Sequence, residues 1–227
     1  IMGASKKLME ELIMAYSGRL KITTARFANV AFSNGSLPQG FLERLNKKQP
    51  WSCPLGIRRF FVSPRESGEL CLLASVLGES GDIIFPKLDE ERDMITFDAI
   101  ALDLLKYLGL KPDKCSSEDE ARDKALHLCD DSTAWPVYFF ETDTSGEKPY
   151  EEFYTGQEVI DTEKFVSLGV IKNAPRRDFA EIDAIFRRLR ELFDSGSVTK
   201  AGVVEILHEW LPGFEHIEKG KGLDSKM

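Results

Sequence analysis

Two positions early in the sequence combine residue types that bind anions or hydroxyl groups with places where a parallel sheet could expose them. Asn29 closes a run of β-branched and aromatic residues, which predicts that it ends a buried strand. An amide there can donate to a phosphate oxygen or a hydroxyl group, because open α/β sheets bind ligands at the carboxyl ends of their strands. The alternative is a turn-forming residue that bonds only to local backbone. Gly35 and Ser36 precede a predicted helix whose free N–H groups could face an anion, although a plain loop is the commoner arrangement.

Four charged side chains are further candidates, and each has a plainer alternative. The planar guanidinium of Arg59 suits paired phosphate oxygens, whereas its neighbour Arg58 is expected to be a solvated charge. Lys6, near a helix start, could be a fixed point charge beside a hydroxyl group or an ordinary exposed lysine. Lys87 could reach the phosphates of a ligand or simply lie on the surface. Glu66 is most simply a helix-capping residue.

Several other chemistries find no support in the sequence. The histidines are far apart and form no H-E-x-x-H pattern, which argues against a zinc site, and no G-x-S-x-G marks a hydrolase. The net charge of −8 argues against a nucleic-acid-binding protein. The cysteines are widely spaced without a C-x-x-C pair, so we expect free thiols. These residues are His127, His208 and His216, and Cys53, Cys71, Cys115 and Cys129.

The first ninety residues predict alternating helices and strands. Apolar residues at helical spacing predict a helix over residues 2–17, which Gly18 ends. Ser63, Pro64 and Glu66 form a capping box that predicts the start of a helix reaching Gly78. Strands are predicted over residues 20–30, 51–55 and 82–86, a short helix from about residue 38 to 46, and a charged loop over residues 87–93.

The remainder of the sequence predicts more helix than strand. Thr96 begins a helix that Gly109 ends, and Ser117 with Glu120 forms a second predicted capping box, for a helix to about residue 128. The longest periodic segment covers residues 178–194, and a last helix is expected from about residue 197 to 211, before Pro212. Residues 135–142 predict a strand and residues 143–156 a polar, turn-rich connection.

Length and composition suit a globular protein of one large or two small domains. The 227 residues are 42% hydrophobic, which is enough for a substantial core. No apolar run approaches the length of a membrane span, and the opening residues do not have the pattern of a signal peptide. Because Ile1 is not an initiator and the chain opens on a helix, we expect it to be part of a longer protein.

Several motifs carry a resemblance to a known family. They are Met2-Gly3-Ala4-Ser5-Lys6, Arg26-Phe27-Ala28-Asn29-Val30, Ser33-Asn34-Gly35-Ser36 and Arg59-Phe60-Phe61, with weaker similarity over residues 138–143, 147–153 and 164–173. The sequence resembles the C-terminal half of extended short-chain dehydrogenases, and within them the nucleotide-sugar dehydratases of bacterial polysaccharide biosynthesis similar to UDP-N-acetylglucosamine 4,6-dehydratase. The resemblance covers nearly the whole chain, but the glycine-rich dinucleotide-binding half is missing. Met2 stands where the family has its catalytic tyrosine.

The resemblance implies an α/β fold: the C-terminal part of a Rossmann-like parallel sheet in residues 1–90, then a mostly helical substrate-side region in residues 91–227. It also implies NAD, rather than NADP, as cofactor. The intact enzyme would oxidise carbon 4 of UDP-N-acetylglucosamine, eliminate water across carbons 5 and 6, and return the hydride to carbon 6. Lys6 would hold the cofactor ribose and tune the acid–base group, which Met2 cannot be.

The same resemblance assigns the binding residues and the setting. Asn29 and Arg59, with Ser36, Glu66 and Lys87, would hold the UDP-sugar, and the helix over residues 2–17 would pair with its twin in a homodimer or larger homo-oligomer. We expect a cytoplasmic bacterial protein. Two alternatives stay open: a nucleotide-sugar epimerase with the same binding residues, and a non-catalytic module that binds a nucleotide-sugar or assembles.

Overall fold

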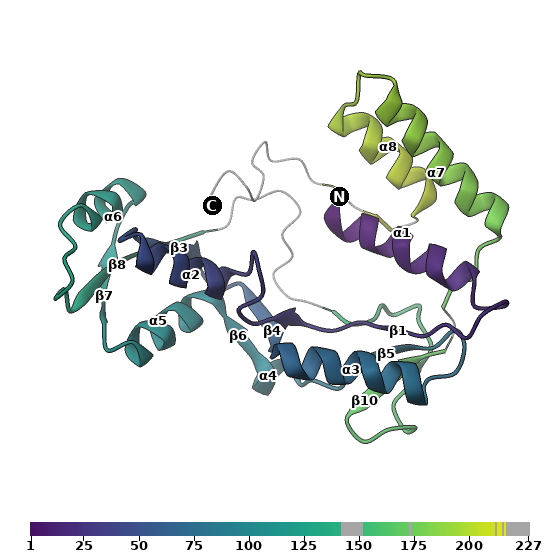
Figure 1. Ribbon diagram of the computed structural model, residues 1–227, viewed down its shortest axis with the longest axis horizontal. Coiled ribbons are helices and arrows are strands. Elements are labelled where there is room, and N and C mark those ends of the chain that lie inside the picture. The colour runs from purple at the N-terminus through teal and green to yellow at the C-terminus, as the bar shows by residue number, and fades with distance from the viewer. Residues whose placement is uncertain (142–151, 173, 212, 215, 217–227) are drawn as a thin grey trace.

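The computed structural model describes residues 1–141, 152–172, 174–211, 213–214 and 216. It is a mixed α/β structure with parallel strands and a helical region, which confirms the predicted fold class. Three sheets follow one another along the length of the molecule in Figure 1: β3, β8 and β7 at the left, β2, β4 and β6 in the middle, and β1, β5, β10 and β9 at the right. No helix among the described residues is both long and apolar enough to span a membrane.

The four-stranded sheet has the order β1-β5-β10-β9. Its strands are β1 (Thr24–Ala25), β5 (Ile83–Pro86), β10 (Leu168–Ile171) and β9 (Ile160–Asp161). β1 and β5 run parallel, with Thr24 opposite Ile83, and β10 joins the other edge of β5 in the antiparallel sense. Gly169 of β10 lies against the ring of Phe85, where an added Cβ would fall 2.2 Å from the ring Cζ, so only glycine fits there.

Helices cover both faces of this sheet because its side chains alternate between them. Ile83, Phe85 and Ile171 pack with Met14 of helix α1 (Met2–Ala15) on one face. Ile84 and Val170 pack on the other face with Leu70 and Ala74 of α3 (Pro64–Leu77). The helical hairpin of α7 (Phe179–Asp194) and α8 (Lys200–Trp210) then packs against α1 from the side away from the sheet (Figure 1).

The middle sheet explains why the strand predicted over residues 20–30 is wrong as a single strand. Only its two ends are strands, and they join different sheets: β1 pairs with β5, and β2 (Asn29–Val30) pairs in parallel with β4 (Arg58–Val62). β6 (Met94–Thr96), which follows the one-turn helix α4 (Glu90–Asp93), completes the middle sheet antiparallel to β4. The chain therefore crosses from one sheet to the next at residues 26–28.

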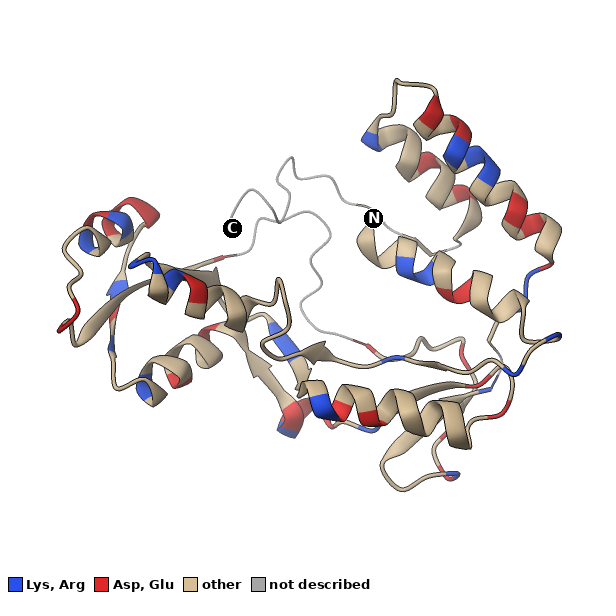
Figure 2. Ribbon diagram, viewed as in Figure 1, with Lys and Arg blue, Asp and Glu red and all other residues tan. Residues whose placement is uncertain are grey.

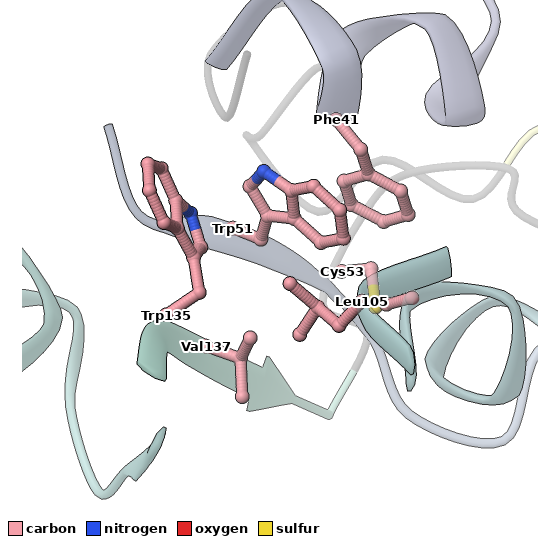
Figure 3. Close-up of a cluster of buried hydrophobic side chains, with 7 residues drawn as sticks. Phe41, Trp51, Cys53, Leu105, Trp135 and Val137 are labelled. Carbon is pink, nitrogen blue, oxygen red and sulfur yellow. The ribbon is translucent and has the colours of Figure 1, made fainter. Parts of the chain in front are cut away.

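The third sheet is fully parallel and carries two buried tryptophans, Trp51 and Trp135. β3 (Trp51–Pro54), β8 (Ala134–Phe140) and β7 (Lys111–Cys115) have the order β3-β8-β7. The helices of this part are α2 (Leu37–Asn46), α5 (Phe97–Tyr107) and α6 (Glu118–Ala125). Trp51 is completely buried and its ring stacks on Phe41 of α2 at 4.7 Å (Figure 3).

The predicted helices are all present, but several details differ. The capping box at Ser63 and Glu66 is confirmed. At the second box only half is correct: Ser117 accepts from the Glu120 N–H, but the Glu120 carboxylate accepts from Ser116, not Ser117. The short strands β4, β6, β7, β9 and β10 were not predicted. Thr142 at the end of the strand predicted over residues 135–142, residues 143–151 of the predicted polar connection, and Pro212 lie outside the described residues.

Strand pairing runs across the division proposed at residue 90. β5 pairs with β10, β4 with β6 and β3 with β8, so each of the three sheets contains strands from both sides of that residue. The two-part division stays a prediction about which segments serve the cofactor and which the substrate.

Candidate functional site

Helix α1 presents two faces of different character. Ala4, Leu8 and Glu11 are buried against the α7–α8 hairpin. Lys6 lies on the opposite, exposed side with Met2 and Met9, which are 67% and 54% exposed. The spacing of these three residues places them on one stripe of the helix. The structure thus leaves the Lys6 ammonium accessible within an apolar surface, and the surface that we expected to pair with a second copy is partly occupied by the chain's own helices.

The end of β1 is held by a dense ionic network around Arg26. Its Nε and Nη2 atoms donate to the two Glu10 carboxylate oxygens at 2.8 and 2.7 Å. Its Nη2 and Nη1 atoms donate to the two Glu158 oxygens at 2.7 and 3.0 Å, and Nη1 also donates to the Phe153 carbonyl at 2.9 Å. Lys7 adds a second cation to Glu10 at 2.7 Å. This arrangement joins α1, the β1–β2 connection and residues 153–158.

Both carboxylates of this network titrate at lower pH than free glutamates. Burial on its own would raise the pKa of Glu10, but the hydrogen bonds and charges of Arg26 and Lys7 outweigh it and lower that pKa below its usual value. Burial would also raise the pKa of Glu158. The hydrogen bonds from Arg26 and from the Thr155 N–H have the larger effect, so the pKa of Glu158 is lowered as well. The network is therefore fully charged at neutral pH.

Asn29 bonds to a neighbouring strand, and Ser36 bonds to its own helix. Asn29 opens β2 instead of ending a buried strand, so that prediction is wrong; its side chain is half-buried and donates to the Phe60 carbonyl at 3.3 Å. Ser36 caps α2 by accepting from the Gln39 N–H at 3.4 Å. The α2 N-terminus therefore exists as predicted, with the serine hydroxyl engaged in the cap.

The two arginines of β4 point to different neighbours. Arg59 donates to the Arg58 carbonyl at 2.8 Å, and its guanidinium lies 5.7 Å from the centre of the Phe97 ring. Arg58 donates to the Glu90 carbonyl, so it is not the freely solvated charge that we expected. β2 and β4 are neighbours, which brings Arg59 and Asn29 into one sheet.

Glu66 caps its own helix, and Lys87 bonds to a distant segment of the chain. The Glu66 carboxylate accepts from the Ser63 N–H at 2.6 Å, and this bond lowers the Glu66 pKa. Lys87 donates to the carbonyls of Thr162 and Phe165, the latter at 2.6 Å, and so fastens the β9–β10 connection to the end of β5. Lys87 is therefore not the loose surface lysine of the plainer alternative.

The predicted site residues do not gather into a single hollow. Of the hollows found, one of about 320 Å³ lies beside β1, between residues 21–25 and Cys71, Ala74 and Ser75 of α3. Another, of about 240 Å³, lies between the end of α2 and α6. None of the predicted site residues lines either one.

Sequence reasoning missed the Arg26 network. Arg26 belonged to a motif of the resemblance, but its partners at positions 10 and 158 are too distant in sequence to be recognised from spacing.

The cysteines are as the sequence predicted. All four are free thiols, and burial raises the pKa of Cys53 to about 12. Among the described residues no group of three or more histidine, cysteine, aspartate or glutamate side chains could hold a metal ion.

Comparison with known proteins identifies the family of this chain. No curated protein matches the sequence. A similar solved structure, the X-ray structure of Pen from Bacillus thuringiensis, superposes with a TM-score of 0.53 at 18% identity, over 74% of this chain and 47% of that chain. At this identity the similarity shows the fold alone, and the chain spans about half the length of the structure it matches. Residues 1–173 match the family described as polysaccharide biosynthesis protein, which is of the NAD-dependent epimerase and dehydratase type, and the chain belongs to this family.

Proposed function

We propose that the chain is the substrate-side half of a nucleotide-sugar 4,6-dehydratase that acts on a UDP-N-acetylhexosamine, most simply UDP-N-acetylglucosamine. The observation that carries the proposal is the exposed Lys6 on the apolar stripe of α1, in a chain whose family is of the epimerase and dehydratase type. A lysine ammonium held there suits a hydroxyl-rich ligand and can lower the pKa of a neighbouring acid–base group.

The open edge of β1 supports the view that a second half completes the protein. The N–H of Arg26 donates to Ile84 of β5 and that of Thr24 to Asp82 just before β5, so those of Thr23 and Ala25 face the other way, where no described strand pairs with them. Apolar side chains flank this edge on α3, where Leu72 and Val76 are each 64% exposed. In Figure 2 the charges of α3 lie near its beginning and the rest of the helix carries none. An unpaired strand edge between apolar helical surfaces is typical of a sheet that continues.

The residues of this chain do not by themselves fit NAD. A dinucleotide needs a glycine-rich turn between a strand and a helix, and the sequence contains no G-x-G-x-x-G. Of the residues in this chain, Lys6 is the one that we propose to contact the cofactor. We therefore assign the cofactor to the other half and derive no reaction step from it.

The substrate roles divide between two elements. Asn29 and Arg59, in neighbouring strands β2 and β4, are proposed to bind the UDP-sugar, with the α2 N-terminus behind Ser36 facing its phosphates. Lys6 is proposed to orient the cofactor ribose. Glu66 and Lys87 are proposed to support the site by holding α3 and the β9–β10 connection.

The direct test is turnover of UDP-N-acetylglucosamine by the longer protein that contains this chain. We expect a 4-keto-6-deoxy product, detected by mass spectrometry, and a fall in kcat of about 100-fold or more in Lys6→Ala, since general acid–base catalysis contributes about 10²–10⁴ in rate. Lys47→Ala, an exposed lysine at the end of α2, is the matched control and should retain full rate. A C4 epimer instead of the keto product would establish the epimerase, and no turnover would reject catalysis on this substrate.

The proposed second half also predicts the reactivity of Cys71. This thiol is exposed on α3 beside the open edge of β1, so it should react rapidly with a thiol reagent in the 227-residue chain and slowly in the longer protein. Cys129, exposed on the far part of the molecule, should react in both, and buried Cys53 in neither. Peptide mapping by mass spectrometry gives the three rates. Equal Cys71 rates in the two proteins would contradict docking at this edge.

A further inference from the structure

Arg26 uses every donor that an arginine has. The guanidinium has five N–H groups, and the five bonds to Glu10, Glu158 and the Phe153 carbonyl engage all of them at 2.7–3.0 Å. Arg26 binds each of the two carboxylates in a bidentate manner, which fixes the orientation of each carboxylate as well as its distance from the guanidinium. All three side chains are largely shielded, with exposures of 21% for Arg26, 15% for Glu10 and 10% for Glu158. Such a centre defines one orientation of the elements that it joins.

The elements joined by Arg26 are those that carry the proposed site. Glu10 lies one helical turn after Lys6 on α1, so the direction of the Glu10 carboxylate is tied to that of the Lys6 ammonium. Asn29 follows Arg26 by three residues, at the start of β2. Phe153, whose carbonyl Arg26 binds, stacks on Phe60 of β4 at 5.2 Å.

A second arginine, Arg177, also binds a glutamate of α1 and can be compared directly with Arg26. Arg177 donates to Glu11 at 2.7 Å and to the Trp210 carbonyl at 2.6 Å, and so fastens α1 to the α7–α8 hairpin. Glu10 and Glu11 are adjacent in sequence, but they face different neighbours. The Arg177 pair holds α1 from the side away from the sheet, and among the described residues Arg177 makes no hydrogen bond to β2, β4 or residues 153–158.

We propose that Arg26 is a positioning residue, which sets the orientation of α1, and hence of Lys6, relative to the substrate-binding strands. This inference rests on the proposed function. Lysine cannot replace arginine in the role, because a single ammonium cannot bind two carboxylates and a carbonyl with fixed geometry. A loss of orientation by about 1 Å costs roughly 100-fold in rate without removing a reacting group.

The test is Arg26→Lys in the longer protein, with Arg177→Lys as the matched control. We expect Arg26→Lys to lower kcat for UDP-N-acetylglucosamine by about 10- to 100-fold with little change in KM, because the charge stays while the orientation is lost. Arg177→Lys should keep kcat within about twofold at a comparable loss of Tm. Equal kcat losses in both variants, or an unchanged kcat in Arg26→Lys, would overturn the inference.

A second measurement separates this inference from the proposed function. If the wild-type protein shows no turnover, the proposed function fails, and hydrogen exchange on the same longer protein still tests Arg26. Arg26→Lys should speed exchange both in α1 and at residues 153–158, whereas Arg177→Lys should speed it in α1 and the hairpin only. Exchange at residues 153–158 that is unchanged in Arg26→Lys shows that Arg26 does not hold the two elements together, and the inference is then wrong.

Discussion

Replacing Trp51 by alanine is expected to lower the free energy of unfolding by about 3–5 kcal/mol, the usual cost of deleting a large buried aromatic side chain. The indole is completely buried between α2 and the parallel sheet, and its ring stacks on Phe41 at an angle of 18° (Figure 3). Loss of this ring leaves a cavity that Val137 and Leu105, both fully buried, cannot fill without moving the backbone. Urea denaturation followed by far-UV circular dichroism measures the loss.

Two controls separate the cavity from a general effect of substitution. Leu126→Ala removes a side chain that is 81% exposed just after α6 and should change stability by less than about 0.5 kcal/mol. Trp51→Phe keeps a stacked ring and removes the indole N–H, which is buried with no hydrogen-bond partner among the described residues, so it should cost less than Trp51→Ala. If Trp51→Ala were as mild as Leu126→Ala, the side chain would not be in the core described above.

The second large effect is expected for Arg26→Ala, at about 3 kcal/mol of unfolding free energy. Removing the guanidinium leaves the shielded Glu158 carboxylate without its cation and leaves Glu10 with Lys7 alone, and breaking a buried ion pair in this way costs about 3–5 kcal/mol. We place the value at the lower end because each of the three groups retains some solvent contact. Thermal and urea unfolding of the 227-residue chain give the measurement. The triple variant Arg26→Ala with Glu10→Gln and Glu158→Gln should recover part of the loss, since no unpaired carboxylate remains and Lys7, which loses Glu10, is 35% exposed to water.

The same network predicts how stability depends on pH. Glu10 and Glu158 have a lower pKa in the folded chain than the ordinary value of 4.5, so the folded state holds these protons more weakly than the unfolded state. Their stabilising contribution is complete above pH 4.5 and is lost as the pH falls through the folded pKa values. In Arg26→Ala the decline in stability below pH 4.5 should be shallower than in the wild type. An identical slope in both proteins would mean that Arg26 is not what lowers these pKa values.

The helices could be predicted because their signals are local. The capping box at Ser63 and the apolar period of residues 178–194 involve residues within a few turns of one another, and both predicted helices are present. The short strands β9 and β10 carry no such signal, since a strand of two to four residues is decided by its neighbours in the sheet and not by its own residues. Asn29 was misplaced for a similar reason. The apolar run before it is long enough for one strand, and only tertiary pairing shows that the chain changes sheets within it.

In the candidate site, too, contacts between residues close in sequence could be predicted and contacts between distant residues could not. The capping role of Glu66 could be read from the sequence because its partner lies three residues away. The partners of Lys87 and Arg26 lie 75 to 132 residues away, except for Glu10, so nothing in a single sequence identifies them. The position of Lys6 on an exposed stripe follows from helical spacing, but the apolar open edge of β1 beside α3 required the fold.

The position of β5 in the middle of its sheet governs the order in which the protein can fold during synthesis. β5 pairs on one edge with β1, which leaves the ribosome first, and on its other edge with β10. About 80 residues separate β5 from β10, and at 5–20 residues per second their synthesis takes roughly 4–16 s. Throughout this time the backbone edge of β5 that pairs with β10 stays open. The nascent chain therefore presents an aggregation-prone strand edge for seconds, and binding of a chaperone is expected to begin after β5 emerges and to end when β10 arrives.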